Sequence, residues 1–126
     1  MRPLIWTLVF LTVGMCWAEV NFERDVQPIF AKRCLACHGP EEQVSGLRLD
    51  SPEANLKGSD SGPVVVPNSS GTSELMQRVS SKNKDFVMPP AGHPLTAAEI
   101  AAIRDWIDNG AKIPKTSSRK ESNTKE

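Results

Sequence analysis

The chain of 126 residues carries apolar positions at helical spacing in three short stretches, which are separated by longer polar segments. The clearest stretch follows Thr96, which forms a T-x-x-E capping box with Glu99 at the start of a predicted helix. One apolar stripe runs along this helix and comprises Ile100, Ile103, Trp106 and Ile107. Asn109-Gly110 is typical of a helix end, so the pattern predicts a last helix between Thr96 and Asn109.

Two shorter helices are predicted earlier in the chain. The first spans Asp25 to Arg33, with Asp25 as the N-cap and Pro28 in the first turn, where the missing N–H is harmless. Its apolar face comprises Val26, Ile29 and Phe30. The other spans Ser73 to Ser80 and directs Leu75, Met76 and Val79 inward. Together these stretches predict a mostly α-helical protein.

The segment 41–72 is rich in Gly, Pro, Ser, Asn and Asp, and we interpret it as a long ordered loop. Leu47 and Leu49 are expected on one side of this loop, and we interpret Val64 to Val66 as a short extended segment between two prolines. The residues 115–126 are polar and charged throughout, which predicts a disordered tail. The sequence shows no internal repeat and indicates one domain over 19–114.

The N-terminal residues have the pattern of a secretion signal. Arg2 is followed by the apolar stretch Leu4 to Val13, and Cys16-Trp17-Ala18 places small residues at positions −3 and −1 of a cleavage site after Ala18. The alternative of a retained membrane anchor is disfavoured, because a transmembrane span needs about 20 apolar residues. Lipidation at Cys16 is also disfavoured by the bulky Met15 before it. We therefore expect export to the periplasm or an equivalent space and no transmembrane span in the mature chain.

The chemistry of the chain centres on Cys34-Leu35-Ala36-Cys37-His38, a C-x-x-C-H sequence. This is the attachment signature of a c-type haem, in which both thiols add to the vinyl groups of one porphyrin. The histidine after the second cysteine then binds the iron from below. The chain has three cysteines, and signal cleavage would remove Cys16. The remaining pair lacks the further ligands of a structural zinc site, so one covalent haem accounts for both thiols.

A six-coordinate haem needs a second ligand opposite His38, and three residues are candidates. Met88 stands in a predicted loop that Pro89-Pro90 stiffens, so its thioether could hold the iron against water. Met76 occupies an inward helical position, where core packing explains it. His93 is the rival, because imidazole binds iron strongly and Gly92 and Pro94 also place it in a loop. We favour Met88 as the distal ligand.

Composition excludes several classes of function. Fifteen basic and fifteen acidic residues give no net charge, and no basic patch with interleaved aromatic residues points to nucleic acid. The mature chain of about 108 residues suits a single small domain, for which a covalent haem would add an apolar body to a thin core. We expect a monomer.

The order of five segments resembles the planctomycete-type cytochrome c domain, within the wider class I cytochrome c superfamily. The segments are C-L-A-C-H, G-L-R-L-D, S-E-L-M-Q-R-V, M-P-P and L-T-x-x-E-I-x-x-I-x-x-W-I-x-x-G-A, and they extend over about Val20 to Lys112. The resemblance implies a small cytochrome c-like fold, with N- and C-terminal helices crossing beside one haem. It implies thioether links at Cys34 and Cys37, His38 as proximal ligand and Met88 as distal ligand. Members of that family often carry large additional domains, which this sequence does not show.

The resemblance also implies residues that pack on the haem. Leu47, Arg48 and Leu49 match a segment expected to wrap it, and Pro89 follows the distal ligand. We hypothesise from its charge and position that Arg48 pairs with a haem propionate.

Two functions from different classes follow from these expectations. The first is a mono-haem electron carrier, not an enzyme, that meets unidentified redox proteins through a small transient interface. The second is a haem sensor or a peroxidase-like domain whose sixth iron site is open or labile. A third interpretation, a partner-binding domain that carries C-x-x-C-H by chance, is disfavoured by the export signal and the M-P-P loop.

Overall fold

The computed structural model describes Gly14 and residues 19–114. The predicted cleavage after Ala18 and the predicted disordered tail over 115–126 lie outside these residues. Within the described part the chain forms helices and turns and no strand. Its elements are η1 (Phe22–Val26), α1 (Gln27–Arg33), η2 (Val44–Gly46), α2 (Pro52–Lys57), η3 (Ser70–Thr72), α3 (Glu74–Ser80) and α4 (Ala97–Asp108). The prediction of a mostly α-helical protein is confirmed for these residues.

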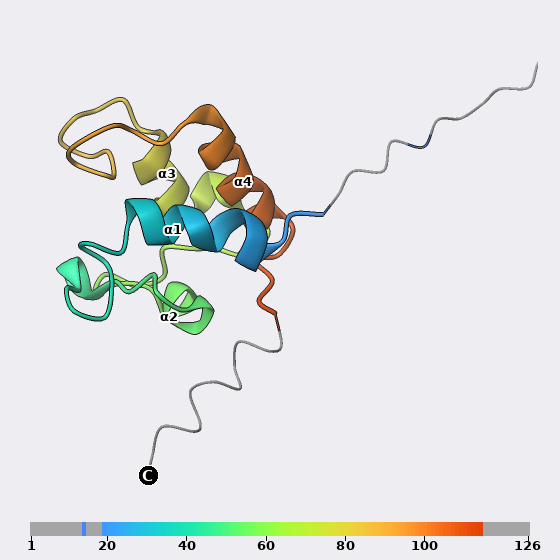
Figure 1. Cartoon of the computed structure of the whole chain (residues 1–126), viewed down its shortest axis with the longest axis horizontal. Coiled ribbons are helices and arrows are strands. Elements are labelled where there is room, and N and C mark those ends of the chain that lie inside the picture. The colour runs from blue at the N-terminus through green and yellow to red at the C-terminus, as the bar shows by residue number, and fades with distance from the viewer. Residues whose placement is uncertain (1–13, 15–18, 115–126) are drawn as a thin grey trace, which may run out of the picture.

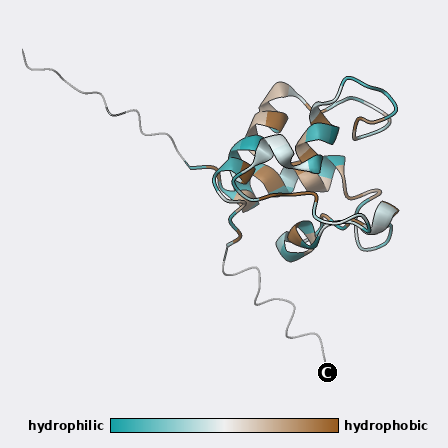
Figure 2. Ribbon diagram, turned by 180° about the vertical axis from the view of Figure 1, so that it is seen from behind, coloured by the Kyte–Doolittle hydropathy of each residue, from teal (hydrophilic) through white to brown (hydrophobic). Residues whose placement is uncertain are grey.

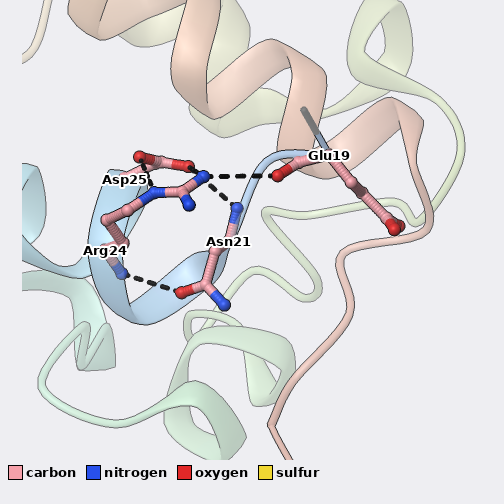
Figure 3. A network of polar contacts seen from close by, with 4 residues as sticks. All are labelled: Glu19, Asn21, Arg24 and Asp25. Atoms are coloured by element: carbon pink, nitrogen blue, oxygen red, sulfur yellow. Dashed lines mark hydrogen bonds and ion pairs between the residues drawn. The ribbon is translucent and has the colours of Figure 1, made fainter. Parts of the chain in front are cut away.

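The first helix begins one turn earlier than the sequence predicts. A π-helical turn, η1, precedes α1, and Asn21 is its N-cap through an Oδ1 that accepts from Arg24 N at 2.9 Å. Asp25 is not the cap; its carboxylate accepts from Asn21 N at 2.9 Å and from the Arg24 guanidinium (Figure 3). Arg24, together with this N–H, holds the pKa of Asp25 at about 2. Capping by Asn21 therefore adds Phe22 to the buried face of the helix.

The two later helices follow the sequence patterns. α3 has Ser73 as its N-cap and buries Leu75, Met76 and Val79. The capping box of α4 is complete, because Glu99 N donates to Thr96 Oγ1 at 3.2 Å and Thr96 N donates to Glu99 Oε2 at 2.8 Å. Gly110 ends this helix with a φ of 99°, a left-handed conformation that glycine adopts without strain.

The segment 41–72 is more structured than the predicted loop. It contains α2, which starts where Ser51 Oγ accepts from Ala54 N at 3.2 Å and where Pro52 occupies the first turn. Asn55 on α2 is fully buried. With its side-chain nitrogen turned towards the backbone, this amide donates to Ser51 O and Leu49 O. The helix thus supports the segment that carries Leu47 and Leu49, both of which are buried.

The core lies between the first and last helices. Figure 1 shows the continuous η1–α1 helix crossing α4, and η1 packs against α4. The rings of Phe22, Phe30 and Trp106 form a cluster with centroid distances of 5.1 to 6.3 Å. The loop 81–95 between α3 and α4 projects away from these helices, and its first residues are hydrophilic (Figure 1 and Figure 2). This arrangement leaves the C-terminal end of α1 beside the loop segments rather than inside the aromatic cluster.

Candidate functional site

The C-x-x-C-H segment continues directly from the end of α1. Cys34 N and Leu35 N both donate to Phe30 O, at 2.9 and 3.1 Å, so the chain leaves the helix without a break. Cys34 O then accepts from Cys37 N at 3.3 Å and from His38 N at 2.9 Å. These bonds form a compact turn that presents two thiols and an imidazole within five residues. Cys34 is half-buried and Cys37 is exposed.

The chain after His38 folds back onto this turn. Val44 N donates to Cys37 O at 3.0 Å, and Leu49 N donates to His38 O at 2.7 Å. Gly39 allows the reversal, because a Cβ at this position would lie 2.5 Å from Leu35 O. The backbone of His38 is therefore tied to the segment 47–49, which the family resemblance implies would wrap the haem.

A cavity of about 150 Å³ opens beside this turn, and it brings together residues that are far apart in the sequence. Cys34, His38 and Met88 all line it. Its apolar wall consists of Val44, Leu47, Leu49, Val64, Leu75 and Val79. Its polar residues are Ser45, Ser59, Ser61, Glu74 and Arg78. A thiol that could form a thioether link to a porphyrin thus shares one largely apolar space with an imidazole and a thioether, the two side chains that could ligate a haem iron.

The electrostatics of the turn fit an apolar group in this cavity. Burial raises the pKa of the Cys34 thiol to about 11, so the thiol stays protonated at neutral pH. The Nδ1 atom of His38 is buried and has no hydrogen-bond partner. Leaving such an atom unpaired costs about 1–3 kcal/mol. A half-buried thiol and a histidine ring with an unpaired nitrogen are suited to receive a bound group.

The three candidates for the distal ligand are placed differently. Met88 lines the cavity with His38, and its N–H donates to Arg78 O at 3.1 Å. Met76 is buried in the core, with 5% of its surface exposed, and does not line this cavity. His93 is exposed and does not line it either. The cavity therefore brings only Met88 of the three together with His38.

Two of the predicted packing residues lie outside the cavity lining. Arg48 binds Asp50 with two hydrogen bonds of 2.9 and 2.6 Å, and this pairing lowers the pKa of Asp50. To pair with Arg48, a haem propionate would have to share the guanidinium with Asp50 or displace Asp50 from it. Pro89 lines a second, larger cavity of about 650 Å³, which shares Val79 with the first. That cavity is lined by no thiol, imidazole or thioether, so its size does not make it the site of the chemistry.

Sequence reasoning missed two charged residues of the site. Arg78 and Glu74 both line the cavity, and they form an ion pair of 3.1 Å on α3. Their i, i+4 spacing on a helix was a visible signal, because such pairs face each other. Nothing in the sequence showed that this helical face would meet His38 and Met88.

The fold and the cavity together define a small helical domain whose C-x-x-C-H turn lies beside a largely apolar cavity. A family described as Planctomycete cytochrome C matches residues 34–92, a segment that contains every residue lining the cavity. The chain therefore carries a planctomycete-type cytochrome c domain, as its motifs predicted, and a domain of this type suggests binding of covalent haem c. No curated protein and no solved structure matches the chain. Among the described helices, none has the length and apolar character that crossing a bilayer requires.

Proposed function

We propose that this protein is an exported mono-haem cytochrome c that carries electrons between redox proteins and is not itself an enzyme. The observation that carries the proposal is that Cys34, His38 and Met88 line the same largely apolar cavity. In the loaded protein the haem supplies one-electron chemistry through its iron. The periplasm or an equivalent space is the proposed location, because haem c is attached after export and the N-terminal sequence has a signal pattern.

Each residue of the site has a distinct part in this proposal. Cys34 and Cys37 hold the group by thioether bonds, so it cannot dissociate. His38 is the proximal ligand, and the bond from Leu49 N to its carbonyl oxygen fixes its backbone. Met88 is the distal ligand, a neutral thioether that favours the reduced state and raises the reduction potential.

The cavity walls support electron transfer by excluding water. Leu47, Leu49 and Val79 are each at most 9% exposed, so the side of the cavity they form is dry. A ligand held in a dry site moves little when the charge on the iron changes, which keeps the reorganisation energy low. Val44 lines the cavity and is exposed, and Cys37 in the neighbouring turn is also exposed. A redox partner could approach here through an interface below about 1,200 Å².

The proposal is tested on the exported, matured protein by optical spectroscopy. We expect a mass increase of one haem, a low-spin ferrous spectrum, and the weak long-wavelength ferric band of a sulfur ligand. Met88→Ala is expected to abolish that band and to let carbon monoxide bind the ferrous form. Met76→Leu and His93→Ala are the matched controls and are expected to keep the band. A wild-type protein that is high-spin and binds carbon monoxide would instead support the sensor or peroxidase-like alternative.

A further inference from the structure

We propose that Arg78 is the positioning residue that holds Met88 over the cavity, an inference that rests on the proposed role of Met88 as distal ligand. Met88 stands in the loop 81–95, which projects from the helices (Figure 1). A loop that carries a weak thioether ligand must be held in place, because otherwise water or another ligand would compete for the same position. Three sets of contacts made by Arg78 hold this loop in place.

The first contact is through the main chain. Arg78 lies in the last turn of α3, where carbonyl groups lack a partner within the helix. Its carbonyl oxygen accepts from Ser81 N at 3.4 Å and from Met88 N at 3.1 Å. The first residue of the loop, Ser81, and the later Met88 are therefore hydrogen-bonded to the same carbonyl group, which fixes Met88 at the end of α3.

The second contact is through the guanidinium group. Arg78 Nη1 donates to Phe86 O at 3.4 Å, and the guanidinium carbon lies 4.1 Å from the centre of the Phe86 ring. Phe86 is thus held by its carbonyl group and by its ring, two residues before Met88. Phe86 N and Val87 N both donate to Asn83 O, so two hydrogen bonds close the turn before Met88.

The third contact fixes the guanidinium itself. Glu74 Oε1 accepts from Arg78 Nε at 3.2 Å and from Nη2 at 3.1 Å. Both side chains line the cavity that contains His38 and Met88. The planar fork of arginine makes these bonds and the ring contact at the same time, which the single ammonium of lysine cannot do.

The consequence concerns exchange at the distal position rather than stability alone. If Arg78 only stabilised α3, its replacement would lower the free energy of unfolding and leave the iron ligands unchanged. If it positions Met88, its replacement raises the fraction of molecules in which Met88 is displaced. The apparent affinity for an added ligand rises in proportion to that fraction.

Imidazole binding to the ferric, haem-loaded protein measures this fraction, and we would compare three variants with the wild type. Arg78→Lys keeps the charge and loses the fork, and we expect imidazole to bind about tenfold more tightly, with a weaker sulfur band. Glu74→Gln is expected to give a smaller increase. Arg104→Lys, at an exposed position of α4, is the matched control and is expected to bind imidazole as the wild type does. Urea unfolding of each variant separates ligand exchange from loss of stability.

Each outcome decides between the two proposals. Wild-type imidazole affinity and an unchanged sulfur band in Arg78→Lys would overturn the role of Arg78. A wild type that binds imidazole as tightly as Met88→Ala does would instead overturn the role of Met88. If Arg78→Lys fails to mature, Phe86→Leu removes the ring contact and keeps the arginine. Tighter imidazole binding in Phe86→Leu would support the inference, and unchanged binding would contradict it.

Discussion

At the scale of single residues, the two cysteines of one short motif occupy different environments. Cys34 is half-buried and lines the cavity, whereas Cys37 is exposed and does not line it. Desolvation raises the pKa of Cys34 to about 11, although the charge of Arg33 acts in the opposite direction. Since the thiolate is the nucleophile of cysteine, burial protects one thiol of the pair more than the other.

This difference predicts the order of alkylation in the haem-free chain. At pH 8 only about 0.1% of Cys34 would be thiolate, so iodoacetamide should modify Cys37 first. Peptide mass spectrometry after short exposures measures the two rates, and we expect Cys34 to be at least about tenfold slower. Circular dichroism confirms that the helices are present, and unfolding in urea should remove the difference. Equal rates in the folded chain would contradict the burial of Cys34.

At the scale of elements, one arginine joins the end of α1 to the start of α4. Arg33 Nη2 donates to Pro94 O at 2.9 Å and to Glu99 Oε2 at 3.2 Å. The same Glu99 oxygen accepts from Thr96 N in the capping box. Arg33 directly precedes Cys34, and Pro94 ends the segment that follows Met88. The pair therefore links the C-x-x-C-H turn to the far end of the Met88 loop.

The titration of Glu99 makes this link sensitive to acid. The hydrogen bond from Thr96 N, and then the interaction with Arg33, lower the pKa of Glu99 below its ordinary value of 4.5. A lowered pKa stabilises the folded state above the ordinary value, and this contribution is lost as the pH falls through the folded value. We expect Glu99→Gln to cost about 0.5–1 kcal/mol at pH 7 and less at pH 3.

Urea unfolding of the haem-loaded protein at both pH values measures this difference. Asp105→Asn, at an exposed position on the same helix, is the control. Its difference from the wild type in free energy of unfolding should be the same at pH 7 and pH 3. A Glu99→Gln penalty that is unchanged at pH 3 would show that the charge of Glu99 is not what stabilises the junction.

At the scale of the whole molecule, the aromatic core and the cavity use different residues. Phe22, Phe30 and Trp106 pack between η1, α1 and α4, and none of them lines the cavity. The cavity wall comes instead from the segment 44–64, α3 and the Met88 loop. The aromatic core can therefore support the cavity without lining it.

This separation predicts that stability and spectrum respond to different substitutions. Ile103→Ala removes a fully buried core side chain and should lower the free energy of unfolding by about 2–5 kcal/mol, with an unchanged haem spectrum. Leu49→Ala removes a buried cavity wall residue and should change both stability and spectrum. Urea unfolding and the ferric spectrum measure the two effects. A shifted sulfur band in Ile103→Ala would contradict the separation.

The sequence alone determined the features that depend on near neighbours in the chain. The capping box of Thr96 and Glu99, the apolar stripe of α4 and the inward face of α3 are local patterns, and the structure confirms them. The C-x-x-C-H motif was also visible, because Cys34, Cys37 and His38 lie within five residues. Two local signals were misread: Asn21 rather than Asp25 caps the first helix, and Ser51-Pro52 starts α2.

Only the tertiary structure decided which distant residues share the cavity. Met88 and His93 stand five residues apart in one loop, yet Met88 lines the cavity with His38 and His93 does not. Arg48 pairs with Asp50, while Arg78 contacts Phe86 and the Met88 backbone. These choices depend on how α1, α3 and the 44–64 segment pack together. No single stretch of sequence encodes such a meeting point, because its free energy comes from contacts between segments that are distant along the chain.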